Sequence, residues 1–300
     1  MSCLKRLANA AFCGCISLLL LACGQASSTN TEIKKETPAM SQQVSIHIGE
    51  LGPELLKRYP ALVKVQHQPA GVDFYKIDWD QRPRGVVIVE HGKHSFKIED
   101  VLGTSATQDL GKLASEGLSE IDIYAGMSVS SPGLIPHDEA RLKTYALLQR
   151  ILQAGWRPMV SRSDPRISGK ARFDYFFSVD DTIGLDPLYT PSLEEWMRIE
   201  SRTDWMFYAD HLYMTVSFTR ERTLTDPTKP GSYLLNFNVK SEAEYFRGFV
   251  EPLKRDQWKE LLPAVLAKLA PIRAKTEAEL RAKGVKINES YEETPLPSLK

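Results

Sequence analysis

Alternating apolar and polar positions dominate the first half of the chain and predict β-strands. Two short apolar runs, 86–89 and 95–98, flank the tetrapeptide His91-Gly92-Lys93-His94, whose glycine suits the tight turn of a β-hairpin. Similar but less regular alternation predicts further strands at 44–48, 61–66, 72–79, 121–124 and 156–160. We therefore expect this half of the chain to build a sheet.

Helical spacing is clearest between Asp138 and Ala154, where apolar side chains recur every three or four residues at Tyr145, Leu148 and Leu152. Acidic residues stand at the beginning of this segment, where they complement the helix dipole, and a glycine follows its end. These features predict one long amphipathic helix.

The second half of the chain mixes the two periods. A hairpin is predicted from 205–208 and 212–219, and a half-buried strand at 232–239. A helix is predicted at 191–199, with Thr190 as a possible cap. A second helix is predicted after the capping box Ser241-Glu242-Ala243-Glu244. A third is predicted at 258–283, which Pro263 and Pro271 are expected to break or kink.

This order of elements predicts an α+β fold in which antiparallel sheet or sheets pack against several helices. The globular domain is expected to span 44–287, with a soft division near 164–187, a stretch rich in Asp, Ser, Gly and Pro. The segment 288–300 contains Pro295 and Pro297 and is expected to be a disordered tail.

The N-terminus has the pattern of a signal peptide. Lys5 and Arg6 precede an apolar run of about 15 residues, shorter than the roughly 20 that a membrane-spanning helix needs. The run ends in Leu20-Leu21-Ala22-Cys23, which resembles the lipobox of bacterial lipoproteins. That resemblance implies cleavage after residue 22 and acylation of Cys23, rather than an ordinary cleaved signal or an anchoring helix.

A flexible tether is expected at 23–43, since these residues are mainly Ser, Thr, Lys, Glu and Pro and lack aromatic side chains. Gly24, rather than Asp, follows the lipidated cysteine, and by resemblance to enterobacterial sorting this favours the outer membrane, facing the periplasm. Two or three acyl chains would make the attachment long-lived.

Composition narrows the function further. Of the four cysteines, Cys3, Cys13 and Cys15 lie in the predicted signal peptide and Cys23 takes lipid, so no disulfide framework or cysteine metal site is expected. Basic and acidic residues number 38 each, and removal of Lys5 and Arg6 leaves 36 against 38. Without a basic surplus, nucleic acid is not an expected partner.

Motifs for chemistry are weak. The chain has no Gly-x-Ser-x-Gly elbow, no His-Glu-x-x-His and no phosphate loop. His91 and His94 could chelate a metal, and the pairs Asp78/Asp80 and Asp180/Asp181 could act in acid–base hydrolysis, but each context reads more simply as a turn. We therefore expect no catalytic residue, no cofactor and no metal, and no enzyme activity.

Several stretches resemble proteobacterial lipoproteins that serve as immunity partners of type VI secretion phospholipase effectors. The resemblance rests on these segments: Arg82-Pro83-Arg84-Gly85, His137-Asp138-Glu139-Ala140-Arg141-Leu142 running on to Gly155-Trp156-Arg157-Pro158, Ser161-Arg162-Ser163-Asp164, Tyr189-Thr190-Pro191-Ser192-Leu193-Glu194-Glu195-Trp196 and Asp226-Pro227-Thr228-Lys229-Pro230-Gly231.

The resemblance implies stoichiometric binding of a co-encoded toxic effector, a lipase, by occlusion, with the lipid holding the inhibitor at the membrane. It assigns no partner-binding residue. The alternative left open is a structural or assembly lipoprotein of the bacterial envelope, which would bind a resident component instead.

Overall fold

A computed structural model describes residues 42–79, 82–128, 133–179, 183–201 and 203–299. Its centre is one sheet of eleven strands with the main order β1-β4-β5-β6-β11-β10-β9-β8. The strands are β1 (Gln43–Ile46), β2 (Lys64–Gln68), β3 (Val72–Asp78), β4 (Gly85–Val89), β5 (Phe96–Asp109), β6 (Leu118–Gly126), β7 (Leu134–Ile135), β8 (Arg157–Pro158), β9 (Asp204–Ala209), β10 (Leu212–Arg220) and β11 (Gly231–Ser241).

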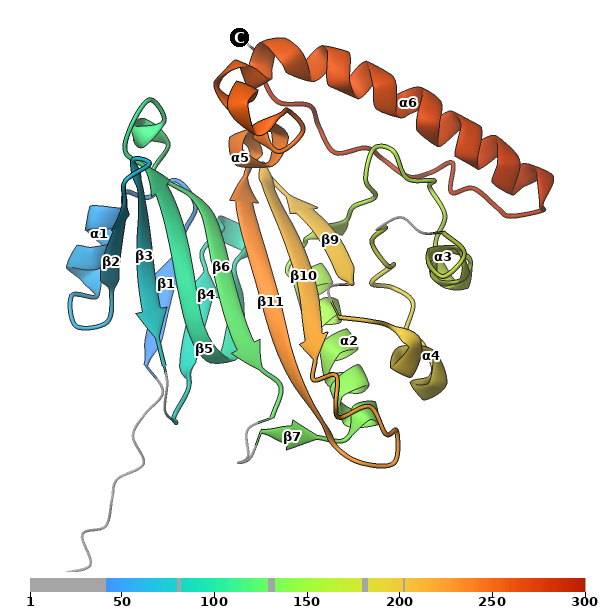
Figure 1. Cartoon of the computed structure of the whole chain (residues 1–300), viewed down its shortest axis with the longest axis horizontal. Helices are drawn as coiled ribbons and strands as arrows, with labels where there is room; N and C mark the ends of the chain where they lie inside the picture. Colours follow the sequence, from blue (N-terminus) through green and yellow to red (C-terminus); the bar gives the residue numbers. More distant parts are fainter. Residues whose placement is uncertain (1–41, 80–81, 129–132, 180–182, 202, 300) are drawn as a thin grey trace, which may run out of the picture. The chain divides into compact units, whose positions relative to one another are not determined.

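The helices flank this sheet and confirm the predicted α+β class (Figure 1). They are α1 (Gly52–Arg58), α2 (His137–Gln153), α3 (Gly169–Phe176), α4 (Leu193–Arg198), α5 (Glu242–Arg247) and α6 (Trp258–Ala282), with short 3-10 turns η1 (Gly92–His94), η2 (Ala114–Glu116) and η3 (Pro252–Gln257). All strand pairs are antiparallel except β1 with β4, which is parallel.

The sheet has two halves joined at β6 and β11. In the first half the long strand β5 pairs with β4 along its beginning and with β3 along its end. In the second half β9, β10 and β11 form a meander, and Asp210 and His211 turn the β9–β10 hairpin with positive φ angles of 37° and 67°. Both predicted hairpins, around residues 91–94 and 210–211, are confirmed.

One face of the sheet is covered by α2, which lies behind β10 and β11 in Figure 1. Trp205 and Phe237 are fully buried on this face. Tyr145 of α2 meets Trp205 edge to face, with ring centroids 5.8 Å apart, and Leu148 is buried in the same core. The predicted helix therefore supplies the layer that its amphipathic spacing implied.

The opposite face is covered only in part. Over the second half, α5 and the beginning of α6 bury Tyr208, Tyr213 and Trp258 in a second apolar cluster, and the Tyr213 and Tyr245 rings stack at 3.7 Å. Over β3, β5 and β6 no helix stands in front of the strands (Figure 1). This leaves an open sheet face beside a covered one.

Helix α6 is continuous through Pro263 and Pro271, so the predicted break is wrong. Both prolines lie on the exposed side of the helix. Water can therefore donate to the backbone carbonyls that each proline leaves without an N–H donor.

The expected disorder of 288–300 is also wrong for the described residues 288–299. Asn288 N donates to Arg166 O at 2.6 Å, Arg162 donates to Thr294 O at 2.7 Å, and Arg273 pairs with Glu293. Thr294 is buried. Ionic and backbone contacts with distant segments order a tail whose own composition is that of a loop.

Other boundaries shift as well. Gln42 already belongs to the domain, because its backbone O accepts from Val86 N and its side chain accepts from Trp79 Nε1, so the tether predicted to run to 43 ends sooner. Residues 40–300 form one compact unit, without the soft division at 164–187, because Phe173 and Leu185 of that stretch join the main core. Ser192, not Thr190, caps α4.

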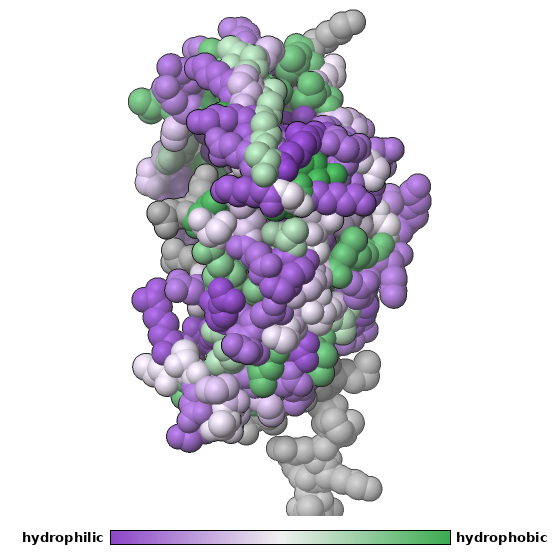
Figure 2. All heavy atoms as spheres, turned by 90° about the vertical axis from the view of Figure 1, so that its right-hand side faces the viewer, coloured by the Kyte–Doolittle hydropathy of each residue, from purple (hydrophilic) through white to green (hydrophobic). Residues whose placement is uncertain are grey.

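The described surface carries scattered apolar side chains. Seen from the side of α3, α4 and α6, small hydrophobic patches alternate with polar ones (Figure 2). A search of the described helices finds none with the length and apolar character to cross a bilayer.

Candidate functional site on the open sheet face

The histidines of the first hairpin are bound to backbone carbonyls. His91 Nε2 lies 3.0 Å from Ala209 O and His94 Nδ1 lies 2.9 Å from Ala154 O, so each imidazole donates to a backbone carbonyl. Each of these bonds uses one of the two ring nitrogens. These histidines tie the hairpin to β9 and to the end of α2.

Of the predicted carboxylate pairs, the structure describes Asp78 alone. Asp78 is 48% exposed and pairs with Lys64 at 3.7 Å. Asp80, Asp180 and Asp181 lie outside the described residues, as does Cys23. Among the residues that the structure describes, no group of three or more His, Cys, Asp or Glu side chains has the geometry of a metal site.

The structure instead gathers polar groups on β6. Residues Ile121 and Ile123 point into the core, so Glu120, Asp122 and Tyr124 share the open face. Tyr124 is 38% exposed. Glycine at Gly103, directly opposite Tyr124 on β5, leaves that part of the face without a competing side chain.

An amide from β11 bridges the two carboxylates. Asn238 faces Asp122 across the strand pair, and its Nδ2 donates to Glu120 Oε1 at 2.5 Å and to Asp122 Oδ1 at 2.9 Å. Lys240 Nζ lies 3.2 Å from the same Glu120 oxygen. Glu120 thus has a cationic partner and a donor, whereas the side chain of Asp122 accepts from the shared amide.

Glu120 and Asp122 line a groove of about 640 Å³, together with residues of α5 and η3. Its lining contains six carboxylate side chains and three cationic ones. Each cationic residue already forms an ion pair with a carboxylate. Arg247 binds both oxygens of Glu116, at 3.0 and 2.6 Å, and also contacts Glu244. Arg255 pairs with Glu244, and Lys112 pairs with Asp256. The groove therefore presents surplus negative charge, centred on Asp122.

Burial raises the pKa of Asp122, and the nearby Glu120 charge acts in the same direction, against the Asn238 hydrogen bond and Lys240. Burial likewise raises the pKa of Tyr124, assisted by Asp122 and Glu120. A carboxylate kept partly desolvated without a cation of its own is costly, and such groups concentrate at functional sites.

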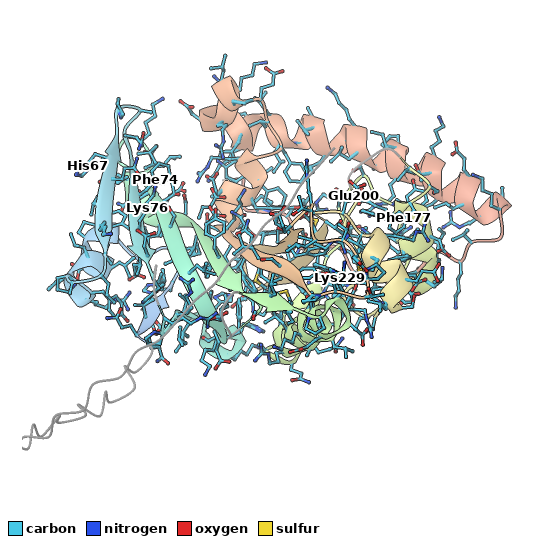
Figure 3. The ribbon with its side chains drawn as sticks, turned by 60° about the horizontal axis from the view of Figure 1, so that its bottom comes forward. His67, Phe74, Lys76, Phe177, Glu200 and Lys229 are labelled. Atoms are coloured by element: carbon cyan, nitrogen blue, oxygen red, sulfur yellow. The ribbon has the colours of Figure 1, made fainter. Side chains whose placement is uncertain are left out.

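The open face continues toward the sheet edge. Phe74 lines the groove, and Lys76 stands on the same face of β3, with its Nζ 5.6 Å from the Phe74 ring centre. In Figure 3 both lie with His67 at one end of the molecule, while Phe177, Glu200 and Lys229 lie at the other. The Phe74 ring thus lines the acidic groove, and Tyr124 of β6 lies on the same sheet face.

The Glu120–Asp122 pair is a poor hydrolytic pair despite its proximity. A glycoside hydrolase holds two carboxyl groups about 5–9 Å apart with the scissile bond between them. Here the Asn238 amide occupies that space and binds both groups. The arrangement suits recognition of a donor-rich partner better than bond cleavage.

Sequence patterns contained a signal for this site that our prediction missed. The stretch Glu120-Ile121-Asp122-Ile123-Tyr124 alternates strictly, which places three polar side chains on one face. What no local pattern contains is the partner amide of Asn238, which is 116 residues away from Asp122.

The segments that carry the family resemblance meet on the opposite, covered face of the sheet. His137 Nδ1 lies 2.6 Å from Tyr233 Oη, which also accepts from Trp196 Nε1 at 3.1 Å, so three of those segments or their neighbours meet in the core. Ser192 and Glu195 form a complete capping box. Comparison of the chain with protein-family models, curated proteins and solved structures gives no significant match.

Proposed function

We propose that this chain is a lipid-anchored, periplasm-facing binding protein that neutralises a co-encoded effector, a secreted lipase, by occlusion. The open face around Asp122 and Tyr124 is its docking surface. The observation that carries this proposal is the acidic groove on an otherwise uncovered sheet face. The resemblance to immunity lipoproteins and the lipobox at Cys23 support the role and the location.

Charge complementarity defines the partner surface. An arginine or lysine side chain entering the groove would neutralise the carboxylate of Asp122, whose side-chain hydrogen bond comes from the neutral Asn238 amide. Tyr124 and Phe74 would supply aromatic contacts beside it. Interfaces commonly draw most of their binding energy from a few such aromatic and charged anchors.

The proposed action is binding without turnover. Asn238 holds the two carboxylates of the groove together in a static network, and tight stoichiometric binding requires no reacting group. A lipid anchor at Cys23 would raise the local concentration of inhibitor at the membrane without making contacts to the effector.

A pull-down with the product of the neighbouring gene tests the function. The full chain should retain that product at about one to one, and Tyr124→Ala and Asp122→Asn should each weaken binding about tenfold or more. Leu142→Ala and Glu139→Gln, on the exposed side of α2, are the matched controls and should change binding less than twofold. Failure of the pair to co-purify, or equal losses in the controls, would remove the immunity proposal.

The alternative, an assembly lipoprotein of the envelope, uses the same surface for a resident partner. Retention of an envelope component from membrane extract, lost with Tyr124→Ala, together with no retention of the neighbour's product, would favour it. Labelled palmitate separates the anchor from both functions: Cys23→Ser should abolish labelling, and persistent labelling would contradict the lipobox.

A further inference from the structure

A second cavity, of about 330 Å³, lies away from the open sheet face. Four segments distant in sequence enclose it: 157–160, 166–172, 185–188 and 288–292. The last of these is part of the C-terminal tail, held by Tyr291, whose Oη accepts from Val160 N at 2.9 Å. The volume is within the range of small-molecule sites.

A buried guanidinium lines this cavity. The side chain of Arg172 is 3% exposed, and burial lowers its pKa against the opposing effect of Asp164. Its Nε donates to Gly184 O, and its terminal nitrogens make longer contacts, 3.3 Å to Pro165 O and 3.4 Å to Asp164 Oδ2. Such distances lie beyond the usual range of strong hydrogen bonds to a charged group.

The other charged residues of the lining are already engaged. Arg166 binds both carboxylate oxygens of Glu277, at 2.8 and 2.7 Å. The two oxygens of Asp186 accept from Gly169 N at 2.7 Å and from Leu188 N at 2.9 Å. Arg157 is 46% exposed and contacts Glu292 at 3.4 Å. Arg172 is therefore the buried cation of the described cavity wall whose terminal nitrogens make only contacts of 3.3 Å or longer.

The remaining wall is largely apolar. Met159, Ile167 and Leu185 are each at most 6% exposed, and the Tyr291 ring belongs to the tail side. Leu188, which is 64% exposed, also lines the cavity and so lies toward its mouth. An apolar chamber with one under-used guanidinium suits an amphiphilic anion rather than a sugar or a peptide.

We propose that this cavity binds a small monocarboxylate with an apolar body, its carboxylate on the terminal nitrogens of Arg172. A planar guanidinium matches the two oxygens of a carboxylate. The apolar body lies against Met159, Ile167 and Leu185, and the tail segment at Tyr291 closes the site. This inference is independent of the proposed docking function.

Thermal unfolding of the purified full chain with hexanoate, hexyl phosphate and hexanol tests the proposal. Hexanoate should raise the melting temperature in a saturable way, and hexanol at equal concentration should not. Equal stabilisation by hexanol, or no saturable effect of hexanoate, would overturn the proposal. Tighter binding of hexyl phosphate than of hexanoate would overturn the carboxylate assignment.

Variants locate the ligand. Arg172→Lys should abolish hexanoate binding, but loss of this buried side chain could also unfold the chain. Leu188→Trp, at the mouth, keeps the core intact and should weaken hexanoate binding at least about tenfold by filling the entrance. Leu253→Trp, at a remote side chain that is 96% exposed, is the control and should leave binding unchanged. Unchanged binding in Leu188→Trp would place the ligand elsewhere and overturn the proposal.

Discussion

The two faces of strands β6 and β11 differ completely, although alternate residues of the same two strands form them. On one face Ile123 and Phe237 are fully buried against the core. On the other, one residue away on each strand, Asp122 lines an open groove and accepts a hydrogen bond from Asn238. A period of two thus lets one strand pair stabilise the fold with one face and present polar groups, the proposed recognition surface, with the other.

The open face also has an energetic cost that the buried face lacks. Asp122 is partly desolvated, and on β9 burial raises the pKa of Asp204 to about 6. By register, Asp204 faces Ser217 on the same side of the sheet as Asn236. Carboxylates in this position oppose folding when ionised, so their presence requires an explanation other than stability.

Truncation of the buried face should have the largest effect. Phe237→Ala should lower the free energy of unfolding by about 3–5 kcal/mol, because it removes a fully buried ring and leaves a cavity. Its neighbour Asn236, whose Oδ1 is buried without a partner in the described structure, is the matched control. Asn236→Ala should change stability by about 0.5 kcal/mol or less in urea unfolding. Similar losses in both variants would show that the two faces are not energetically distinct.

A smaller, pH-dependent effect is expected for Asp204→Asn. The folded pKa of about 6 exceeds the unfolded value of 3.8, so the folded state binds more protons between these values and stability falls as pH rises through this window. The asparagine variant should therefore be more stable than the parent by about 1–2 kcal/mol at pH 7. The difference should vanish near pH 4.

Melting curves of both proteins from pH 4 to pH 7 measure this effect. A constant difference across the range would mean that packing, not ionisation, distinguishes them. The exposed Asp78, converted to Asn, should show no such pH-dependent gain, because it is 48% exposed and paired with Lys64.

The smallest effect on stability is expected at Tyr124. Because its side chain is 38% exposed on the open face, Tyr124→Ala should change the free energy of unfolding by about 0.5 kcal/mol or less. The same variant should lose partner binding, which separates recognition from folding. A loss of several kcal/mol would assign Tyr124 to the core instead.

Local sequence determined the elements whose signals are local. The helical spacing from Asp138 to Ala154 predicted α2, Ser241 predicted the cap of α5 by accepting from Glu244 N, and the turn residues around 91–94 and 210–211 predicted both hairpins. Each depends on side-chain period or capping within a few residues, so these elements follow from propensity and pattern alone.

Only the tertiary structure decided the rest. Helices α1 and α3 were not predicted, because their short segments lack a long apolar period and are held by packing at Leu55 and Phe173. The tail became ordered because Arg162 and Arg273 reach it from elsewhere in the chain. The groove required Asn238 to meet Asp122 across strands 116 residues apart. Alternation in the sequence placed the carboxylates on one face, but their partners are non-local, and only the folded sheet brings them into contact.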